Sequence, residues 1–205
     1  GTDNWFRSIN LASLSPQGPY TLYVRATDRA GNESSEASLD FDVDSANPEI
    51  QNLALSGGAF PAAVHYVNSN FSISFDAFDS NRLKSYSISR NGTVLAAHNA
   101  VDISAEGQGP YAISLSETLG SGAGQLPDGE YAYVITLVDI VNRSSSISRT
   151  VFVDSASPVL AITAPSGGEG VEVTSYTIRG SVEDGEGKGV NSLEYSLNST
   201  DGLDG

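Results

Sequence analysis

The chain contains no cysteine and no methionine among its 205 residues, and no uninterrupted apolar run approaches the 18 residues or more that a transmembrane helix needs. The lack of cysteine excludes disulfides, thiol catalysis and thiolate metal sites. Histidine is nearly absent as well. His65 and His98 have no partners at the spacing of a catalytic triad or a zinc site, so we expect both on the surface.

Basic residues are also scarce. Ten Lys and Arg face 25 Asp and Glu, which gives a net charge of −15 at pH 7. This balance disfavours binding to nucleic acid and to anionic lipid, and is compatible with solubility and with divalent cations. The composition, 39% hydrophobic and 17% charged, is that of a globular protein, and the length suits about two domains.

The hydrophobic pattern has a period of two, which is typical of strands with one buried face. Turn signals such as Asn91-Gly92 and Asp128-Gly129 separate the apolar segments, and we find no convincing helical periodicity. The spacing predicts an all-β sandwich. The predicted strands include residues 20–26, 39–43, 71–78, 83–89, 93–97, 111–115, 131–138, 148–153, 176–182 and 192–197.

The sequence repeats itself over the length of a whole domain. Tyr20 and Tyr131 open similar segments 111 positions apart, and Asp44 and Asp154 close them 110 positions apart. Pro48 and Pro158 each begin a new apolar run after such a segment. The repeat predicts a complete domain at residues 48–157, preceded by the C-terminal half of a module at 1–47 and followed by the N-terminal half of one at 158–205.

Neither half-module alone is expected to bury enough surface for stability. Two explanations stay open. The halves complement each other between molecules, as a swapped dimer or a head-to-tail chain, or the sequence is an excerpt of a longer protein that completes each module.

Several segments resemble the tandem Ig-like domains of large bacterial surface proteins and adhesins. The resemblance is carried by Tyr20–Asn32, by the linker Val43–Pro48 and by Glu183–Leu197. It implies Greek-key Ig-like sandwiches in a cell-surface or secreted protein, with neighbouring Ig-like domains of the same or another chain as partners. The middle repeat departs from the pattern, because Asp139-Ile-Val-Asn142 lacks the glycine of the first repeat, so the shape of that loop stays open.

The resemblance also implies calcium at the domain junctions. In an Ig-like sandwich, the incoming linker and two strand-connecting loops lie at the same end, which would gather Asp44, Asp79 and Asp139. Asp154 and Asp184 would meet in the same way at the next junction, near Glu183. Calcium takes 6–8 oxygen ligands, which such residues supply. The alternative is that these residues stabilise Asx-turns and are solvated.

We therefore expect a non-catalytic structural spacer in an extracellular protein, with any host or glycan ligand left open. The alternative is a carbohydrate-binding or accessory module of a secreted glycoside hydrolase, which would need exposed aromatic side chains. Trp5, the only tryptophan, is expected in the core instead. Tyr23 and Tyr133 are expected at equivalent, outward positions of the repeat.

Overall fold

The computed structural model describes residues 4–10, 17–61, 63–167, 175–185 and 189–196. The chain divides into two compact units, residues 1–153 and 154–205. The described residues form strands and two single-turn 3₁₀ helices, Ala96–His98 and Ser104–Glu106. Within these ranges there is no helix long and apolar enough to cross a membrane. The predicted domain boundaries after residues 47 and 157 stay predictions.

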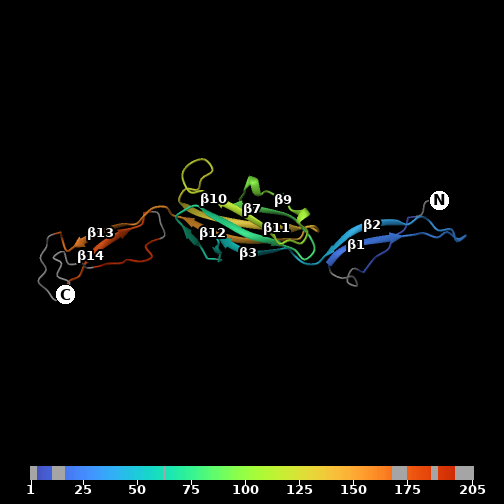
Figure 1. Ribbon diagram of the computed structural model, residues 1–205, viewed down its shortest axis with the longest axis horizontal. Coiled ribbons are helices and arrows are strands. Elements are labelled where there is room, and N and C mark those ends of the chain that lie inside the picture. Colours follow the sequence, from blue (N-terminus) through green and yellow to red (C-terminus); the bar gives the residue numbers. More distant parts are fainter. Residues whose placement is uncertain (1–3, 11–16, 62, 168–174, 186–188, 197–205) are drawn as a thin grey trace. The chain divides into compact units, whose positions relative to one another are not determined.

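The centre of the chain is a sandwich of two sheets (Figure 1), as the strand pattern predicted. The first sheet has the order β10-β6-β3-β4, and the second has the order β5-β12-β11-β7-β8, with β9 also pairing with β7. The strands of the first sheet are β3 (Glu49–Leu55), β4 (Gly58–Ala59), β6 (Phe71–Phe78) and β10 (Tyr111–Glu117). Those of the second are β5 (His65–Val67), β7 (Leu83–Arg90), β8 (Thr93–Val94), β9 (Val101–Asp102), β11 (Gly129–Asp139) and β12 (Ser144–Val153).

The core lies between these sheets because alternate residues of each strand face inward. In β6, every second residue from Phe71 to Ala77 is buried. Aromatic rings bridge the layers edge to face: Phe71 of β6 meets Tyr133 of β11 at a centroid distance of 6.3 Å, and Phe75 meets Tyr86 of β7 at 6.4 Å. Edge-to-face pairs are a preferred aromatic arrangement, so they add to the stability gained from burial.

The hairpin of β1 (Gln17–Val24) and β2 (Ala37–Asp44) reproduces the pairing of β11 with β12. Gly18 pairs with Val43, as Gly129 pairs with Val153. Adding 111 to the residue number on the first strand and 110 on the second converts every pair from Gly18–Val43 to Val24–Ala37 into a pair of β11–β12. The two stretches are thus equivalent strand pairs, as the sequence repeat predicted. The offset also corrects the expectation that Tyr133 is equivalent to Tyr23 and faces outward. Tyr133 corresponds to Leu22 instead, and it faces the core with 1% exposure, whereas Tyr23 is 62% exposed.

The second unit contains the hairpin of β13 (Val159–Ala164) and β14 (Arg179–Glu183), which reproduces the pairing of β3 with β6. Leu160 pairs with Val182, as Ile50 pairs with Ala77. The offsets here are 110 and 105 positions. Both flanking hairpins therefore repeat strand pairs of the central sandwich, β1–β2 its last two strands and β13–β14 two of its first.

Several local expectations differ from the structure; among them, the strand expected at 176–182 is β14 and begins only at Arg179. The segment 93–97 is a strand only at Thr93–Val94, because a 3₁₀ turn begins at Ala96. The described part of 192–197, which ends at residue 196, has no strand. Trp5, expected in a core, is 67% exposed and its neighbour Phe6 is 95% exposed, since no sheet formed by the described residues covers them.

Candidate metal centre

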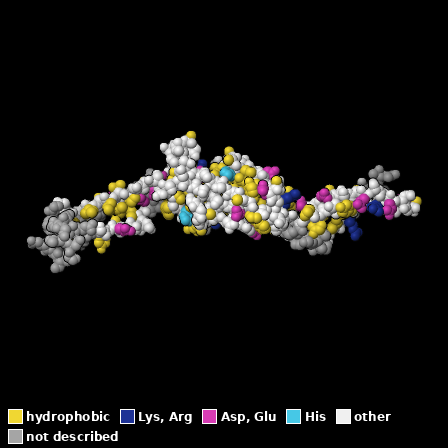
Figure 2. All heavy atoms as spheres, viewed as in Figure 1, with side chains coloured by type: hydrophobic (Ala, Val, Ile, Leu, Met, Phe, Trp, Pro, Cys, Tyr) yellow, Lys and Arg dark blue, Asp and Glu magenta, His cyan; other side chains and the backbone are white. Residues whose placement is uncertain are grey.

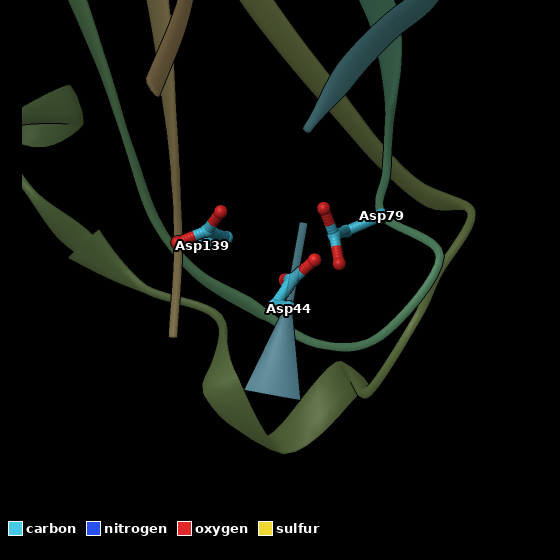
Figure 3. Close-up of side chains that lie close together, drawn as sticks. All are labelled: Asp44, Asp79 and Asp139. Carbon is cyan, nitrogen blue, oxygen red and sulfur yellow. The ribbon is translucent and has the colours of Figure 1, made fainter. Parts of the chain in front are cut away.

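Three aspartates from three separate segments meet at one end of the central sandwich. Asp44 is the last residue of β2, Asp79 directly follows β6, and Asp139 is the last residue of β11. Each offers a carboxylate oxygen, and these atoms all lie within 4.8 Å of one another. Figure 3 shows the three carboxylates turned toward a common space. The geometry thus brings together the first predicted set, Asp44, Asp79 and Asp139.

Each carboxylate uses one oxygen, Oδ1, to hold its own backbone turn. The acceptor oxygen and the backbone N–H donors lie two to four residues apart, which is the Asx-turn arrangement. The bonds run from Ala46 N to Asp44 (3.0 Å), from Asn81 N and Arg82 N to Asp79 (2.7 and 2.9 Å), and from Val141 N and Arg143 N to Asp139 (2.9 and 2.8 Å). The Asx-turns of the alternative explanation are therefore present, but they account for only one oxygen of each carboxylate, and Asp79 and Asp139 are not solvated.

The other oxygen, Oδ2, of all three carboxylates is buried and has no hydrogen-bond partner. Asp79 and Asp139 are completely buried, and Asp44 is partly buried. Two like charges at about 4.8 Å repel by roughly 3–4 kcal/mol at an effective dielectric constant near 20. Three such pairs amount to a repulsion comparable with the whole stability of a domain, about 5–15 kcal/mol. The cluster therefore calls for a proton or a cation.

Electrostatics around Asp44 agree with this conclusion. Burial raises the pKa of the Asp44 carboxyl above its ordinary value, and the charges of Asp79 and Asp139 raise this pKa further. The backbone N–H of Ala46 and the charge of Arg143 act in the opposite direction without reversing the shift. Desolvation and like charges both favour the neutral acid.

The two nearby arginines are engaged elsewhere. The Arg82 guanidinium pairs with Asp42 at 2.9 Å, and Nη1 of Arg143 donates to the Ser45 carbonyl at 2.7 Å. Neither of these bonds reaches an Oδ2 atom of the cluster. These side chains fasten the end of β2 to the sandwich loops but leave the three unpartnered oxygens unsatisfied.

The donor set suits a hard divalent cation. All three ligands are carboxylate oxygens, and no His or Cys belongs to the group, which disfavours zinc. Calcium binds oxygen at about 2.3–2.6 Å, so two of its ligands can lie up to about 5.2 Å apart. The 4.8 Å limit of the cluster falls within that span. The residues present therefore fit calcium, which would complete its shell with backbone carbonyls and water.

The loop that carries Asp139 keeps its shape without the expected glycine. In the first repeat, Gly31 has φ 89°, and in the second its position is taken by Asn142 with φ 67°. The counterpart of Asp139 is Asp28, whose Oδ1 accepts from the backbone N–H two and four residues ahead, just as in the second repeat. Asparagine tolerates this left-handed conformation better than most residues, so the loop left open by the sequence is preserved.

Asp154 and Asp184, the second predicted set, are not part of such a group in the described ranges. Asp154 Oδ1 accepts from Ala156 N at 3.2 Å, which repeats the turn made by Asp44. Asp184 Oδ2 accepts from Gly189 N at 2.9 Å. The predicted meeting of these two side chains stays a prediction.

A buried ionic network between the two sheets was not predicted from the sequence: Glu117 belongs to β10 of the first sheet, and Arg90 and Tyr133 belong to β7 and β11 of the second. Arg90 Nη1 donates to both oxygens of Glu117 at 2.8 and 2.7 Å, and the Tyr133 hydroxyl donates to Glu117 Oε1 at 3.0 Å. Glu117 is 6% exposed. One feature of the sequence could have revealed it. Glu117 is in step with the inward-facing residues of its strand, and a charged side chain at a buried position requires a partner.

Comparison with known proteins assigns no family. No protein-family model matches this chain, and no curated protein matches it significantly. Among solved structures, dimeric latent PorU from Porphyromonas gingivalis is similar with a TM-score of 0.39 and 16% sequence identity. The match covers 72% of this chain and spans 15% of that chain, and at this TM-score it indicates neither a shared fold nor a shared function.

Proposed function

We propose that this chain is a non-catalytic spacer of Ig-like sandwiches in a bacterial surface or secreted protein, and that calcium at Asp44, Asp79 and Asp139 stiffens the entry into the central sandwich. The observation that supports this proposal most strongly is that three carboxylates come together and that their Oδ2 atoms are buried and have no hydrogen-bond partner. One of them ends the incoming strand β2, and the other two lie at the ends of the sandwich strands β6 and β11. A cation held by all three would resist bending at the connection between them.

Other contacts of the incoming segment support a stiffened connection. Arg82 pairs with Asp42, and Arg143 bonds to the Ser45 carbonyl. Both arginines follow the loop aspartates by a few residues, so the loops that would hold the cation also hold the segment. This arrangement suits a load-bearing connection between modules.

The Ig-like assignment rests on topology and on one side chain. Of the six long strands of the central sandwich, the first, second and fourth, β3, β6 and β10, share one sheet, while β7, β11 and β12 share the other, a division like that of Ig folds. The hydroxyl of Tyr131, near the start of β11, donates to the Pro127 carbonyl at 2.8 Å. A tyrosine that bonds back to the upstream backbone at this corner is a hallmark of the fold.

Calorimetry and hydrogen exchange test the cation. Millimolar calcium should raise the melting temperature above that in EGTA and slow amide exchange around residues 42–48. Asp139→Asn should abolish both effects. Asp76→Asn is the matched control, because Asp76 accepts a hydrogen bond from Asn52 away from the cluster and should leave the calcium response unchanged. Equal melting temperatures with and without calcium in the wild type would contradict the proposal.

A second function, carbohydrate binding, is favoured by the exposure of the adjacent aromatic residues Trp5 and Phe6. Exposed rings are what a sugar-binding surface needs. A glycan array separates the two functions. Binding that is lost with Trp5→Ala would support the carbohydrate function, and an array without hits would support the spacer.

A further inference from the structure

The exposed hydrophobic side chains are concentrated outside the central sandwich. Of 17 large hydrophobic residues exposed in the described part of the chain, three belong to residues 48–157 and 14 to residues 1–47 and 158–205. Figure 2 shows hydrophobic side chains at the surface over β1–β2 and over β13–β14. Both flanking hairpins therefore present apolar surface to solvent.

The central sandwich shows what covers such a surface. One face of β1–β2 is apolar, with Leu22 paired to Leu39 and Tyr20 paired to Phe41. By the repeat, Leu22 corresponds to Tyr133 and Phe41 to Val151. In the sandwich these two positions are 1% and 0% exposed, beneath the sheet that contains β6.

The chain carries a second version of that covering sheet in β13–β14. Leu160 and Val182 pair with each other as Ile50 and Ala77 do in β3–β6, and Ala77 is fully buried in the sandwich. Leu160 is 56% exposed and Ile162, on the same face, is 67% exposed. The two flanking hairpins thus carry the two sides of one sheet-to-sheet interface that is already present once in the molecule.

We propose that copies of this chain associate head to tail, with the apolar face of β13–β14 of one copy packed on the apolar face of β1–β2 of the next. The packing repeats the interface between the sheets of the central sandwich. It removes the apolar surface of both hairpins from water, which is the main favourable contribution to such an association.

The same docking would make association depend on calcium, because it assembles a second cation site between the two copies. This part of the inference rests on the proposed function. Asp28, Asp154 and Asp184 are the repeat counterparts of Asp139, Asp44 and Asp79. Docking would bring Asp28 of one copy to Asp154 and Asp184 of the next, and complete a second three-carboxylate site. In the uncovered hairpin, Asp28 Oδ2 accepts from the Asn32 side chain at 2.8 Å, a bond that the cation would displace.

Sedimentation velocity of the 205-residue chain tests the association. We expect species larger than the 21.4 kDa monomer that grow with protein concentration and with calcium. Leu22→Asp and Leu160→Asp should each stay monomeric, because every copy then lacks one of the two faces, and an equimolar mixture of the two should form a discrete dimer through the remaining pair of intact faces. Tyr23→Asp and Ala161→Asp, on the opposite faces of the same strands, are the matched controls and should associate like the wild type.

Two results would overturn the association: a wild type that stays monomeric at all concentrations in calcium, or a mixture of the two aspartate variants that stays monomeric. The cation is tested separately. Asp28→Asn should weaken calcium-dependent association by roughly tenfold or more while the calcium shift in melting temperature of the central sandwich persists. Asp139→Asn should abolish that shift and leave association intact. Equal association of Asp28→Asn and wild type in calcium would overturn the shared cation site.

Discussion

The hydroxyl of Tyr133 donates a 3.0 Å hydrogen bond to Glu117 in the interior of the sandwich, where Glu117 also binds Arg90. Burial raises the pKa of Tyr133, and the negative charge of Glu117 raises this pKa further, so the phenol stays neutral. The carboxylate therefore has both a cationic and a neutral donor. This is the condition under which a buried charge is tolerated.

Replacing Arg90, the cationic side chain of this network, should strongly destabilise the folded protein. Arg90→Leu leaves the Glu117 carboxylate buried without its charge partner, and we expect a loss of about 3–5 kcal/mol in the free energy of unfolding, measured by urea denaturation. Tyr133→Phe keeps the ion pair and should cost only about 1 kcal/mol. The double variant Arg90→Leu, Glu117→Leu should recover most of the stability, and a double variant as unstable as Arg90→Leu would contradict this explanation.

The left-handed backbone conformation of Asn142 leads to a second prediction. Asn142→Ala should destabilise the domain by about 1–2 kcal/mol, because alanine fits this conformation poorly and cannot accept the hydrogen bond from Lys84. Asn142→Gly, which imitates the first repeat, relieves the strain and should lose less than Asn142→Ala in the same urea experiment. The Gly variant should also keep the calcium response, and a variant that folds but no longer responds would show that Asn142 has a further role.

Asp44 should make stability depend on pH when calcium is absent. Its folded-state pKa is raised, so the protonated form is favoured by folding, and this contribution is present below the unfolded pKa of about 3.9 and lost as pH rises through the folded-state value. In EGTA at pH 7, Asp44→Asn should thus melt roughly 2–8 °C above the wild type, a shift that corresponds to about 1 kcal/mol.

The difference between Asp44→Asn and the wild type should disappear below about pH 4, where both side chains are neutral. Calcium should reverse the order at pH 7, because the amide is a poorer ligand. Scanning calorimetry of the pair at several pH values measures both effects. A constant difference in EGTA across the pH range would mean that Asp44 does not titrate in the folded protein as proposed.

Tyr131 provides a test of the corner that begins β11. Tyr131→Phe removes the hydrogen bond to the Pro127 carbonyl and should cost about 0.5–1.5 kcal/mol without changing the calcium response. Chemical denaturation in calcium and in EGTA compares the variant with the wild type. An unchanged free energy of unfolding would remove this support for an Ig-like corner.

Much of the fold was available from local pattern. The alternation that begins at Phe71 predicted β6. The similarity of the segments at Tyr20 and Tyr131 predicted equivalent strand pairs. Each of these patterns lies within a short segment of the chain, so it can be recognised without knowing the fold. Trp5 was misplaced for the opposite reason. A large aromatic residue is buried only where a second sheet covers it, and no local pattern shows whether that sheet is present.

By itself, the sequence determined where most of the strands lie and that one module recurs, since period-two alternation and repeat spacing are properties of the chain alone. The resemblance to Ig-like domains predicted that Asp44, Asp79 and Asp139 meet, but only the tertiary structure decided that one oxygen of each stays buried and unpartnered. It also decided that Asn142 takes the place of Gly31 and that Glu117 is neutralised by Arg90. The reason is physical: partners tens of residues apart are set by sheet packing and by the backbone angles of single loop residues.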